Sequence, residues 1–395
     1  MEKTKQQRKP LIPAPDQSNS GKRAKVHYYD YNLVAVIILL TCFGLIMLYS
    51  TSSYMAELNY GDDMYYFKKQ AAISFVCIIV ALIISKIDYH VLTRFTGILY
   101  GLAAGLMMLV KTPLGRSANG ARRWLNLGPL SFQPSEIAKI AVIVCLSYMI
   151  VHMGKQVRTL KGCMILAGMG GALALFAYVF TDNLSTAIII FCITAGLIFV
   201  AHPDTKIFLI IAGVILALAV IFVVILSSSM ETSSSFRLRR ILVWLNPEKY
   251  ASEGGYQIMQ ALYAIGSGGF FGKGLGNSAQ KMIIPEVQND MILSIICEEL
   301  GVFGAIMVLI LFGMLLYRLL FIAQNAPDLY GSLVVSGIFA HIALQVILNV
   351  MVVINCIPTT GITLPFISYG GTSVLFLMAE MGLALGVSSK IKIAE

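Results

Sequence analysis

Apolar segments of about twenty residues recur along this 395-residue chain, and they constrain its fold more than any other feature. A helix that crosses a bilayer needs about that length, whereas the strands of an outer-membrane barrel are shorter and alternate in polarity. Only 12% of the residues are charged, against about a quarter in soluble domains. In lipid the backbone must satisfy its own hydrogen bonds, so the spans should be α-helical. We predict an all-α polytopic membrane protein with ten transmembrane helices at 32–52, 68–86, 89–110, 136–154, 161–180, 184–201, 206–227, 291–318, 331–353 and 373–390.

The polar segments around these spans predict the topology. Residues 1–30 are rich in Lys, Gln, Pro and Ser, which predicts a disordered basic tail. The tail carries seven Lys and Arg residues, and positive charge favours the cytoplasmic side. An even number of spans then places both termini in the cytoplasm, with the membrane domain at 31–390 and a short C-terminus at 391–395. The residues between the seventh and eighth helices, 228–290, form a long extracellular loop.

Two segments on the predicted outer side, 111–139 and 228–290, are unusually basic. Long loops are translocated despite their charge, but the excess of Lys and Arg on the predicted outer side still needs an explanation. One interpretation is that Lys and Arg side chains extend to lipid headgroups. The other is that they hold an anionic substrate outside the membrane.

The first basic segment reads GRSANGARRWLNLGPLSFQPSEIAKIAV. Its Gly, Asn and Pro residues are turn signals, and it then enters the fourth span. Glu136 and Lys139 are three residues apart, so on a helix they can pair with each other. Ionisable groups inside a membrane are also functional candidates, because burying them unpaired is costly. The candidate substrate-binding residues of this segment are Arg116, Arg122, Arg123, Trp124, Glu136 and Lys139.

The second basic segment contains FRLRRILVWLNPEKY, which predicts an amphipathic helix lying on the outer leaflet. The glycine-rich stretch GGYQIMQALYAIGSGGFFGKGLGNSAQK follows, with Gln257 and Lys281 as further substrate-binding candidates. A Walker loop has four residues between its first Gly and the Gly-Lys pair, whereas Gly268 and Gly272 enclose three. No strand precedes the glycines, so we exclude nucleotide binding.

Acidic residues cluster in the next stretch, IIPEVQNDMILSIICEELG. Pro285 suits the first position of a helix, and Glu286 in its first turn complements the helix dipole. Glu286 is also a substrate-binding candidate. Asp290 is expected one turn further along, on the same face and near the membrane surface. Burial raises the pKa of such a carboxyl and nearby cations lower it.

Glu298 and Glu299 are expected about 12 Å deeper than Asp290 on the same helix, at 1.5 Å per residue. Carboxylates at that depth need partners from other helices, because unpaired charge in lipid is costly. Lys139 is a candidate partner. We interpret both glutamates as structural or gating charges.

The segment IPTTGITLPFISYGGTS interrupts the last apolar stretch with prolines and glycines. Irregular backbone at membrane depth is tolerated where it lines a cavity or is buried in protein. We therefore predict that this segment forms part of a substrate groove, with the Ser368 hydroxyl as a substrate-binding candidate.

Taken in order, these motifs resemble the SEDS family of peptidoglycan glycosyltransferases, whose usual branches are FtsW and RodA. The similarity runs from about residue 32 to residue 390. The long basic tail and the wording PTTGITLPFISYGGTS are more similar to FtsW or its sporulation paralogue than to RodA. The resemblance implies polymerisation of lipid II on the outer face of the bacterial cytoplasmic membrane, for septal cell-wall synthesis.

The resemblance also implies roles for particular residues. The family's indispensable acid lies in a Pro-Glu-x-His-Thr-Asp pattern, which gives Asp290 the role of general base. Gln288 and Asn289 stand where His and Thr are usual, so a role assigned to that histidine does not transfer. A divalent cation (Mg²⁺ or Mn²⁺) and two kinds of partner, a class B penicillin-binding protein and divisome proteins, are further implications.

Two other classes of function fit the sequence. A transporter that flips a lipid-linked precursor is compatible with ten helices and intramembrane charges, but it needs a pathway through the membrane midplane. A non-catalytic scaffold for a transpeptidase needs neither a pathway nor an active site. The surface position expected for Asp290 and the arginines favours the enzyme.

Overall fold

The computed structural model describes residues 25–118, 121–127, 130–203 and 236–394, together with scattered residues between 206 and 223. The expected tail up to residue 24 and ten of the 22 residues of the expected seventh helix, 206–227, lie outside the described residues. Within the described ranges eight helices are long and apolar enough to cross a membrane, and the shorter apolar helix α12 (Thr372–Ser388) joins them. The eight are α1 (Tyr31–Tyr60), α2 (Tyr65–Lys86), α3 (Val91–Leu109), α4 (Pro134–Met153), α5 (Leu160–Phe180), α6 (Leu184–Ala201), α10 (Ile292–Asn325) and α11 (Leu329–Val353).

Each of these helices overlaps one of the spans expected from the sequence, so the multi-pass helical fold is confirmed. The count of ten stays a prediction. Polar side chains set several of the helix starts: Asp30 accepts a hydrogen bond from the Leu33 amide, and Asp328 accepts one from the Gly331 amide. Such N-caps satisfy amide groups that have no partner inside the helix.

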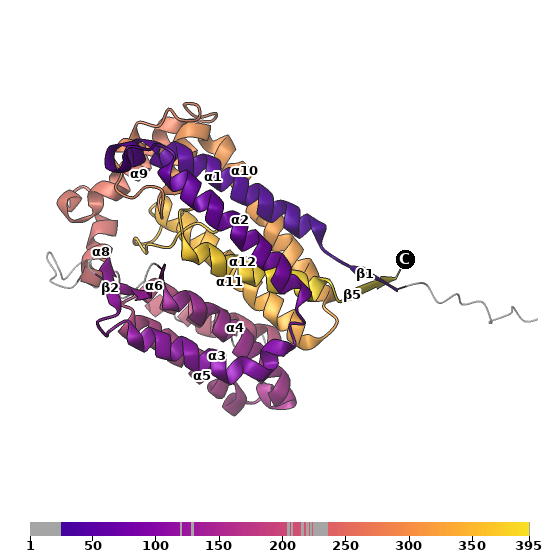
Figure 1. Ribbon diagram of the computed structural model, residues 1–395. Coiled ribbons are helices and arrows are strands. Elements are labelled where there is room, and N and C mark those ends of the chain that lie inside the picture. Colours follow the sequence, from indigo (N-terminus) through magenta and orange to yellow (C-terminus); the bar gives the residue numbers. More distant parts are fainter. Residues whose placement is uncertain are drawn as a thin grey trace, which may run out of the picture.

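The helices form two groups that run in roughly the same direction (Figure 1). Helices α3 to α6 pack on one another, while α1, α2, α10 and α12 form the second group. Helix α11 lies between the groups and contacts α4 and α6 on one side and α10 and α12 on the other. The buried apolar core is continuous through both groups.

The two ends of the bundle carry different elements (Figure 1). At one end, strand β1 (Lys25–Tyr28) pairs antiparallel with strand β5 (Ile391–Ala394). Residues 25–28 of the tail expected to be disordered therefore form a strand, which the sequence analysis did not predict. At the other end lie α8 (Phe236–Leu245), α9 (Gly255–Gly268) and a three-stranded sheet of β2 (Gly115–Ala118), β3 (Ala121–Leu127) and β4 (Leu130–Phe132). We call these the β1–β5 end and the α8–α9 end.

Contacts between α1 and α10 place the two buried glutamates at the α8–α9 end. Near the β1–β5 end, Arg318 pairs with Asp30 at 2.7 Å. Twenty residues further along α1, or about 30 Å, Ser50 donates a hydrogen bond of 2.6 Å to Glu299. The expected greater depth of Glu298 and Glu299 relative to Asp290 stays a prediction. The helix that carries them is short, because Gly301, with a φ of 69° and a ψ of −169°, breaks α10 and leaves residues 292–300 as a separate helix.

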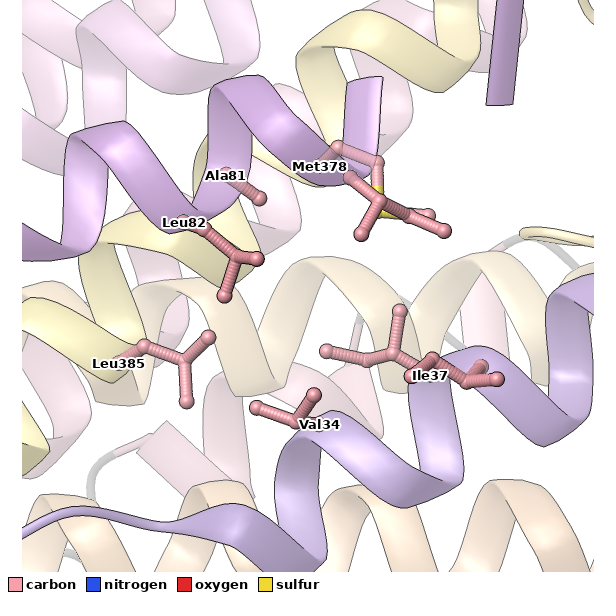
Figure 2. Close-up of a pocket in the computed structure, with 8 residues that line it drawn as sticks. Val34, Ile37, Ala81, Leu82, Met378 and Leu385 are labelled. Atoms are coloured by element: carbon pink, nitrogen blue, oxygen red, sulfur yellow. The ribbon is translucent and has the colours of Figure 1, made fainter. Parts of the chain in front are cut away.

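A small pocket near the β1–β5 end is lined only by apolar side chains. It lies between α1, α2 and α12, as Figure 2 shows for Val34, Ala81 and Leu385. Its lining offers no polar group for catalysis, so the candidate site must be sought elsewhere.

Candidate active site at the α8–α9 end

Asp290 lies in a series of turns that precedes α10, not inside a helix. The prediction of a helix from Pro285 is wrong, because α10 begins only at Ile292. Glu286 has a φ of 48°, the left-handed conformation, and therefore is not in a helical first turn. The turn is closed by a hydrogen bond of 2.9 Å from the Asn289 amide to the Glu286 carbonyl.

A single asparagine fixes Asp290 against the irregular chain between α11 and α12. The Asn349 side chain is fully buried, and its Nδ2 donates to the Asp290 carbonyl at 2.9 Å and to the Ile362 carbonyl at 2.8 Å. The neighbouring Gly361 has a φ of 70°, and a Cβ there would lie 4.0 Å from Asp290 Oδ2. The Asp290 carboxylate therefore lies beside this chain segment, residues 354–371.

The 354–371 segment has no regular secondary structure, and side chains from three helices hold its carbonyl oxygens. Unpaired backbone groups in a buried setting are costly, so these donors are what allow the irregular path. Ser185 of α6 donates to the Thr360 carbonyl (2.7 Å). On α8, Arg240 donates to the Thr359 carbonyl (3.1 Å) and Trp244 to the Asn355 carbonyl (2.9 Å). On α11, Gln345 donates to the Thr363 carbonyl (3.0 Å) and Asn349 to the Ile362 carbonyl (2.8 Å). The segment lies next to Asp290, and its part in a substrate groove stays a prediction.

Asp290 and two arginines influence one another's charge. The pKa of Asp290 is raised to about 6: burial raises it most and the Glu286 charge adds to the rise, while a backbone hydrogen bond and Arg240 oppose it. Burial and the nearby Arg123 lower the pKa of Arg240, while Asp290 raises it. Like charges held close together, as Arg123 and Arg240 are, favour an anionic ligand between or beside them.

Arg123 reaches the site from a β-bulge. In the register of β2 and β3, Arg116 faces Trp124 and Ser117 faces Arg122, so Arg123 is the residue left over. Bulges often redirect a side chain next to a functional site. The Arg123 guanidinium donates to the Asp182 carbonyl at 3.4 Å.

The other basic residues of this segment lie around the same loop. Lys111 pairs with the Asp182 carboxylate at 2.9 Å, and Arg122 donates to the Lys111 carbonyl at 3.5 Å. Arg116 is exposed and Trp124 is half-buried. Substrate contacts by Arg116, Arg122 and Trp124 stay predictions.

Glu136 and Lys139 form an ion pair of 2.9 Å on α4, and only 3% of the lysine side chain is exposed. The interpretation that they pair is confirmed. The prediction that Lys139 is the partner of Glu298 and Glu299 is wrong, because those glutamates have other partners. A substrate contact by either Glu136 or Lys139 stays a prediction.

Glu298 and Glu299 fasten the glycine-rich loop to α10 and α1. Glu298 has no exposed surface and accepts hydrogen bonds from Lys273 Nζ at 2.6 Å and from the Ser278 hydroxyl. Glu299 accepts from Ser50, and Lys281 Nζ lies 3.6 Å from it. These contacts support the structural interpretation of both glutamates.

Two of the three remaining substrate-binding candidates are buried. Lys281 Nζ donates to the Gly276 carbonyl at 2.7 Å. The Ser368 hydroxyl accepts a hydrogen bond of 2.8 Å from the Leu364 amide, which closes a turn. These contacts give both side chains a structural role, and their substrate contacts stay predictions. Gln257 lies half-buried in the first turn of α9, where a ligand role is untested.

Helix α8 forms as predicted, but it does not lie freely on a leaflet. Leu242 and Val243 are buried against the protein, and the Trp244 indole donates to the 354–371 segment. Arg240 on this helix and Asn349 on α11 are site residues that the sequence analysis missed. A signal existed for Asn349, since an amide side chain inside an apolar span is a functional candidate.

A substitution in α1 tests how closely the 354–371 segment must be packed. A Cβ at Gly44 would lie 2.6 Å from the Phe366 carbonyl oxygen and 2.7 Å from the Ile367 Cα, both backbone atoms that cannot rotate away. Phe366 is already in a left-handed conformation, with a φ of 62°. We expect Gly44→Ala to lower the free energy of unfolding by about 1–3 kcal/mol, as overpacking does, and to reduce activity.

The matched control is Gly97→Ala on α3, because a Cβ at Gly97 meets no atom within 4 Å. Thermal unfolding of both variants in the same detergent provides the measurement. If Gly44→Ala unfolds at the temperature of Gly97→Ala, the packing interpretation is incorrect.

Comparisons with known proteins add family evidence to this geometry. The FtsW/RodA/SpoVE family profile, described as "Cell cycle protein", matches residues 30–393. The chain is 36% identical over 383 residues to a "Probable peptidoglycan glycosyltransferase FtsW" of Trichlorobacter lovleyi, covering 93% of this chain and 94% of the relative. It is also 36% identical over 362 residues to "Stage V sporulation protein E" of Bacillus subtilis, covering 91% and 96%.

Solved structures of other proteins are also similar to this chain. One similar chain belongs to a study titled "Structural coordination of polymerization and crosslinking by a peptidoglycan synthase complex", with a TM-score of 0.76, 26% identity, and coverage of 91% of this chain and 97% of that one. The rod shape determining protein RodA of Thermus thermophilus has a TM-score of 0.66 at 25% identity, with coverage of 91% and 96%.

Proposed function

Because this chain belongs to the FtsW, RodA and SpoVE family, we propose that it is the peptidoglycan glycosyltransferase that polymerises lipid II, with Asp290 as general base. The assignment of the base rests on a group of charged side chains at the α8–α9 end. The Asp290 carboxyl, whose pKa is raised to about 6, lies there. Its charge interacts with that of Arg240, which in turn interacts with Arg123. Perturbed carboxyls with specific charged neighbours are typical of active sites.

The cellular setting follows from the same relatives. The chain is a multi-pass protein of the bacterial inner membrane. We orient the α8–α9 end outward and both termini toward the cytoplasm, because seven Lys and Arg residues lie in the N-terminal tail. Septal synthesis is the proposed role, and a class B penicillin-binding protein is the proposed partner. Divisome proteins are further proposed partners. Support for the transpeptidase comes from the similar chain, whose complex couples polymerisation to crosslinking.

The proposed reaction is a single inverting displacement. Asp290 accepts the proton of the sugar 4-hydroxyl of incoming lipid II, and that oxygen forms a bond to the anomeric carbon of the growing lipid-linked strand. The bond from this carbon to the pyrophosphate oxygen breaks, and undecaprenyl pyrophosphate leaves with the electron pair. A general base contributes about 10² to 10⁴-fold, so charge stabilisation of the leaving group must contribute as well.

Arg123 and Arg240 are the proposed partners of the departing pyrophosphate. Their guanidinium groups donate to the carbonyls of Asp182 and Thr359, which hold them in place before the substrate arrives. Guanidinium groups match phosphate oxygens in geometry and stay charged at every working pH. Cations fixed in advance stabilise developing negative charge more effectively than mobile ones.

A divalent cation was expected from the resemblance. Among the residues that the structure describes, no three His, Cys, Asp or Glu side chains gather where they could hold a metal ion. Near Asp290 the other interacting carboxylate is that of Glu286. Structural metal cages need more ligands than these two, so the donor set does not fit a metal held by the protein alone. No step of the proposed reaction passes through a metal.

The pH profile tests the assignment of the base. Asp290 must be deprotonated to act, and its pKa is raised to about 6. We therefore expect kcat/KM to be constant above about pH 7 and to fall tenfold per pH unit below about pH 6. An ordinary carboxyl would place this fall near pH 4. A profile that stays flat down to pH 4.5 would contradict a base with the raised pKa of Asp290.

The activity itself is tested with purified full-length protein and labelled lipid II. Glycan strands of increasing length are expected on a gel. A flippase would move lipid II across vesicles without forming strands, and a scaffold would do neither.

A further inference from the structure

Four tyrosines from three chain segments contact one another at the α8–α9 end. Tyr60 is the last residue of α1, Tyr65 and Tyr66 begin α2, and Tyr369 belongs to the 354–371 segment. The Tyr60 and Tyr65 rings are stacked, with centroids 3.9 Å apart and an interplanar angle of 10°. Tyr66 contacts Tyr65 edge-on at 5.4 Å and Tyr369 at 5.2 Å. We call these four residues the tyrosine platform.

The platform is connected to the candidate active site. The Tyr369 amide donates a hydrogen bond of 2.9 Å to the carbonyl of Gln288, two residues before Asp290. At the other end of the platform, 53% of the Tyr60 side chain is exposed. Aromatic surface therefore continues from the chain beside Asp290 to the outer rim of the protein.

Polar groups accompany the rings. The Lys69 charge acts on the Tyr369 hydroxyl, and the Tyr60 and Tyr66 rings contact each other edge-on at 5.9 Å. Lys68 pairs with Asp62 at 2.9 Å next to the platform. The surface thus combines aromatic faces with hydroxyl and ammonium donors.

This combination suits a saccharide. A pyranose ring in a β-1,4-linked strand presents C–H groups on its faces and hydroxyl and amide groups along its edges. The faces pack on aromatic rings, and the edges bond to hydroxyls and amines such as those of the platform. We propose that the tyrosine platform binds the glycan strand as it leaves the active site. This proposal rests on the proposed function.

Tyrosines at a membrane surface also act as lipid anchors. Tyr54 lies on α1 and is 46% exposed, and no ring contact is described for it, which suits an anchor. The platform differs because its rings contact one another and because one of them, Tyr369, lies in the segment beside Asp290. An anchor needs neither feature.

Binding of the product strand has a kinetic consequence. An enzyme that keeps hold of its product can add the next unit before the strand dissociates. Loss of the platform should therefore shorten the strands, while the rate at which lipid II is first consumed changes little.

The experiment compares Tyr60→Ala with Tyr54→Ala in full-length protein reconstituted in nanodiscs. Tyr60→Ala is expected to shorten the mean strand length at least threefold, with the initial rate of lipid II consumption changed less than twofold. Tyr54→Ala should leave strand length unchanged, and Tyr60→Trp, which restores an aromatic face, should restore it. Equal strand lengths for Tyr60→Ala and Tyr54→Ala would overturn the proposal.

A binding measurement separates this proposal from the proposed function. Lipid-free β-1,4-linked N-acetylglucosamine tetramer is titrated into Asp290→Asn protein, which retains the platform but lacks the proposed base. Saccharide binding that weakens at least fivefold on adding Tyr60→Ala supports the platform, even if the wild-type protein were to make no strands. Strand formation by the wild type without any saccharide binding that depends on Tyr60 would reject the platform alone.

Discussion

Purified Asp290→Asn protein is expected to form glycan strands from labelled lipid II at least about 10²-fold more slowly than the wild type, because a general base contributes about 10² to 10⁴-fold. Asparagine has nearly the shape of aspartate but cannot accept the proton of the attacking hydroxyl. The hydrogen bonds from Asn349 go to the backbone carbonyl of residue 290 and do not depend on the side chain. The substitution should therefore abolish proton acceptance by residue 290 and leave the backbone position of that residue unchanged.

Stability measurements separate lost chemistry from lost folding. The pKa of Asp290 is raised on folding to about 6, so the ionised carboxylate makes the folded state less stable above that pH. Asparagine removes this penalty, and the thermal midpoint of Asp290→Asn at pH 7.5 should equal or exceed that of the wild type. The wild type should gain stability as the pH falls from 7.5 toward 5, whereas the variant should lack this particular gain.

Glu286→Gln is the matched control for the base. The Glu286 charge raises the pKa of Asp290, so its removal should move the acid limb of the pH profile to lower pH. Strand formation at pH 7.5 should remain. Chain formation at the wild-type rate by Asp290→Asn would refute the assignment of the base.

Glu298→Ala is expected to lower the free energy of unfolding by about 1–3 kcal/mol, which is typical when buried donors lose their acceptor. Glu298 is fully buried and receives hydrogen bonds from Lys273, from the Ser278 hydroxyl and from the Gln280 amide at 3.3 Å. Without the carboxylate these donors are left without their acceptor, and unsatisfied buried donors are costly. The loop from Gly268 to Met282 should then be held to α10 mainly by backbone hydrogen bonds, such as those from the Lys273 and Gly274 amides to the Glu298 and Glu299 carbonyls.

Thermal unfolding in detergent measures this loss, with Glu57→Ala as the control. Glu57 also lies on a long apolar helix but is exposed, so its removal should change stability by less than about 0.5 kcal/mol. The stability of Glu298→Gln should lie between those of Glu298→Ala and Glu57→Ala, because the glutamine amide keeps one acceptor oxygen. A Glu298→Ala protein as stable as Glu57→Ala would show that the buried network does not hold the loop.

The sequence was sufficient to predict the helical spans, because lipid demands long apolar helices and these stand out along the chain. Asp290 was also found, but through a motif that resembles a family pattern. Its neighbours were harder to find. Arg240 comes close to Asp290 only because α8 packs on the 354–371 segment, and that packing involves residues more than a hundred positions apart.

The incorrect predictions share a physical cause, which is local backbone geometry. Gly301 breaks α10, and nothing in the residue pattern distinguishes it from a glycine that an intact helix tolerates. The left-handed Glu286 was assigned to a helix because proline and glutamate often begin one. Lys139 was also proposed as a partner of Glu298 and Glu299 by charge alone, whereas it pairs with Glu136.

The 354–371 segment has a consequence for how the gene can change. Surface loops usually accept inserted or deleted residues, because few of their backbone groups are held in place. Here the carbonyls between Asn355 and Thr363 that accept side-chain hydrogen bonds each lie opposite their own donor. Adding or removing one residue would move every later oxygen past its donor, so this stretch should keep its length even where its side chains vary.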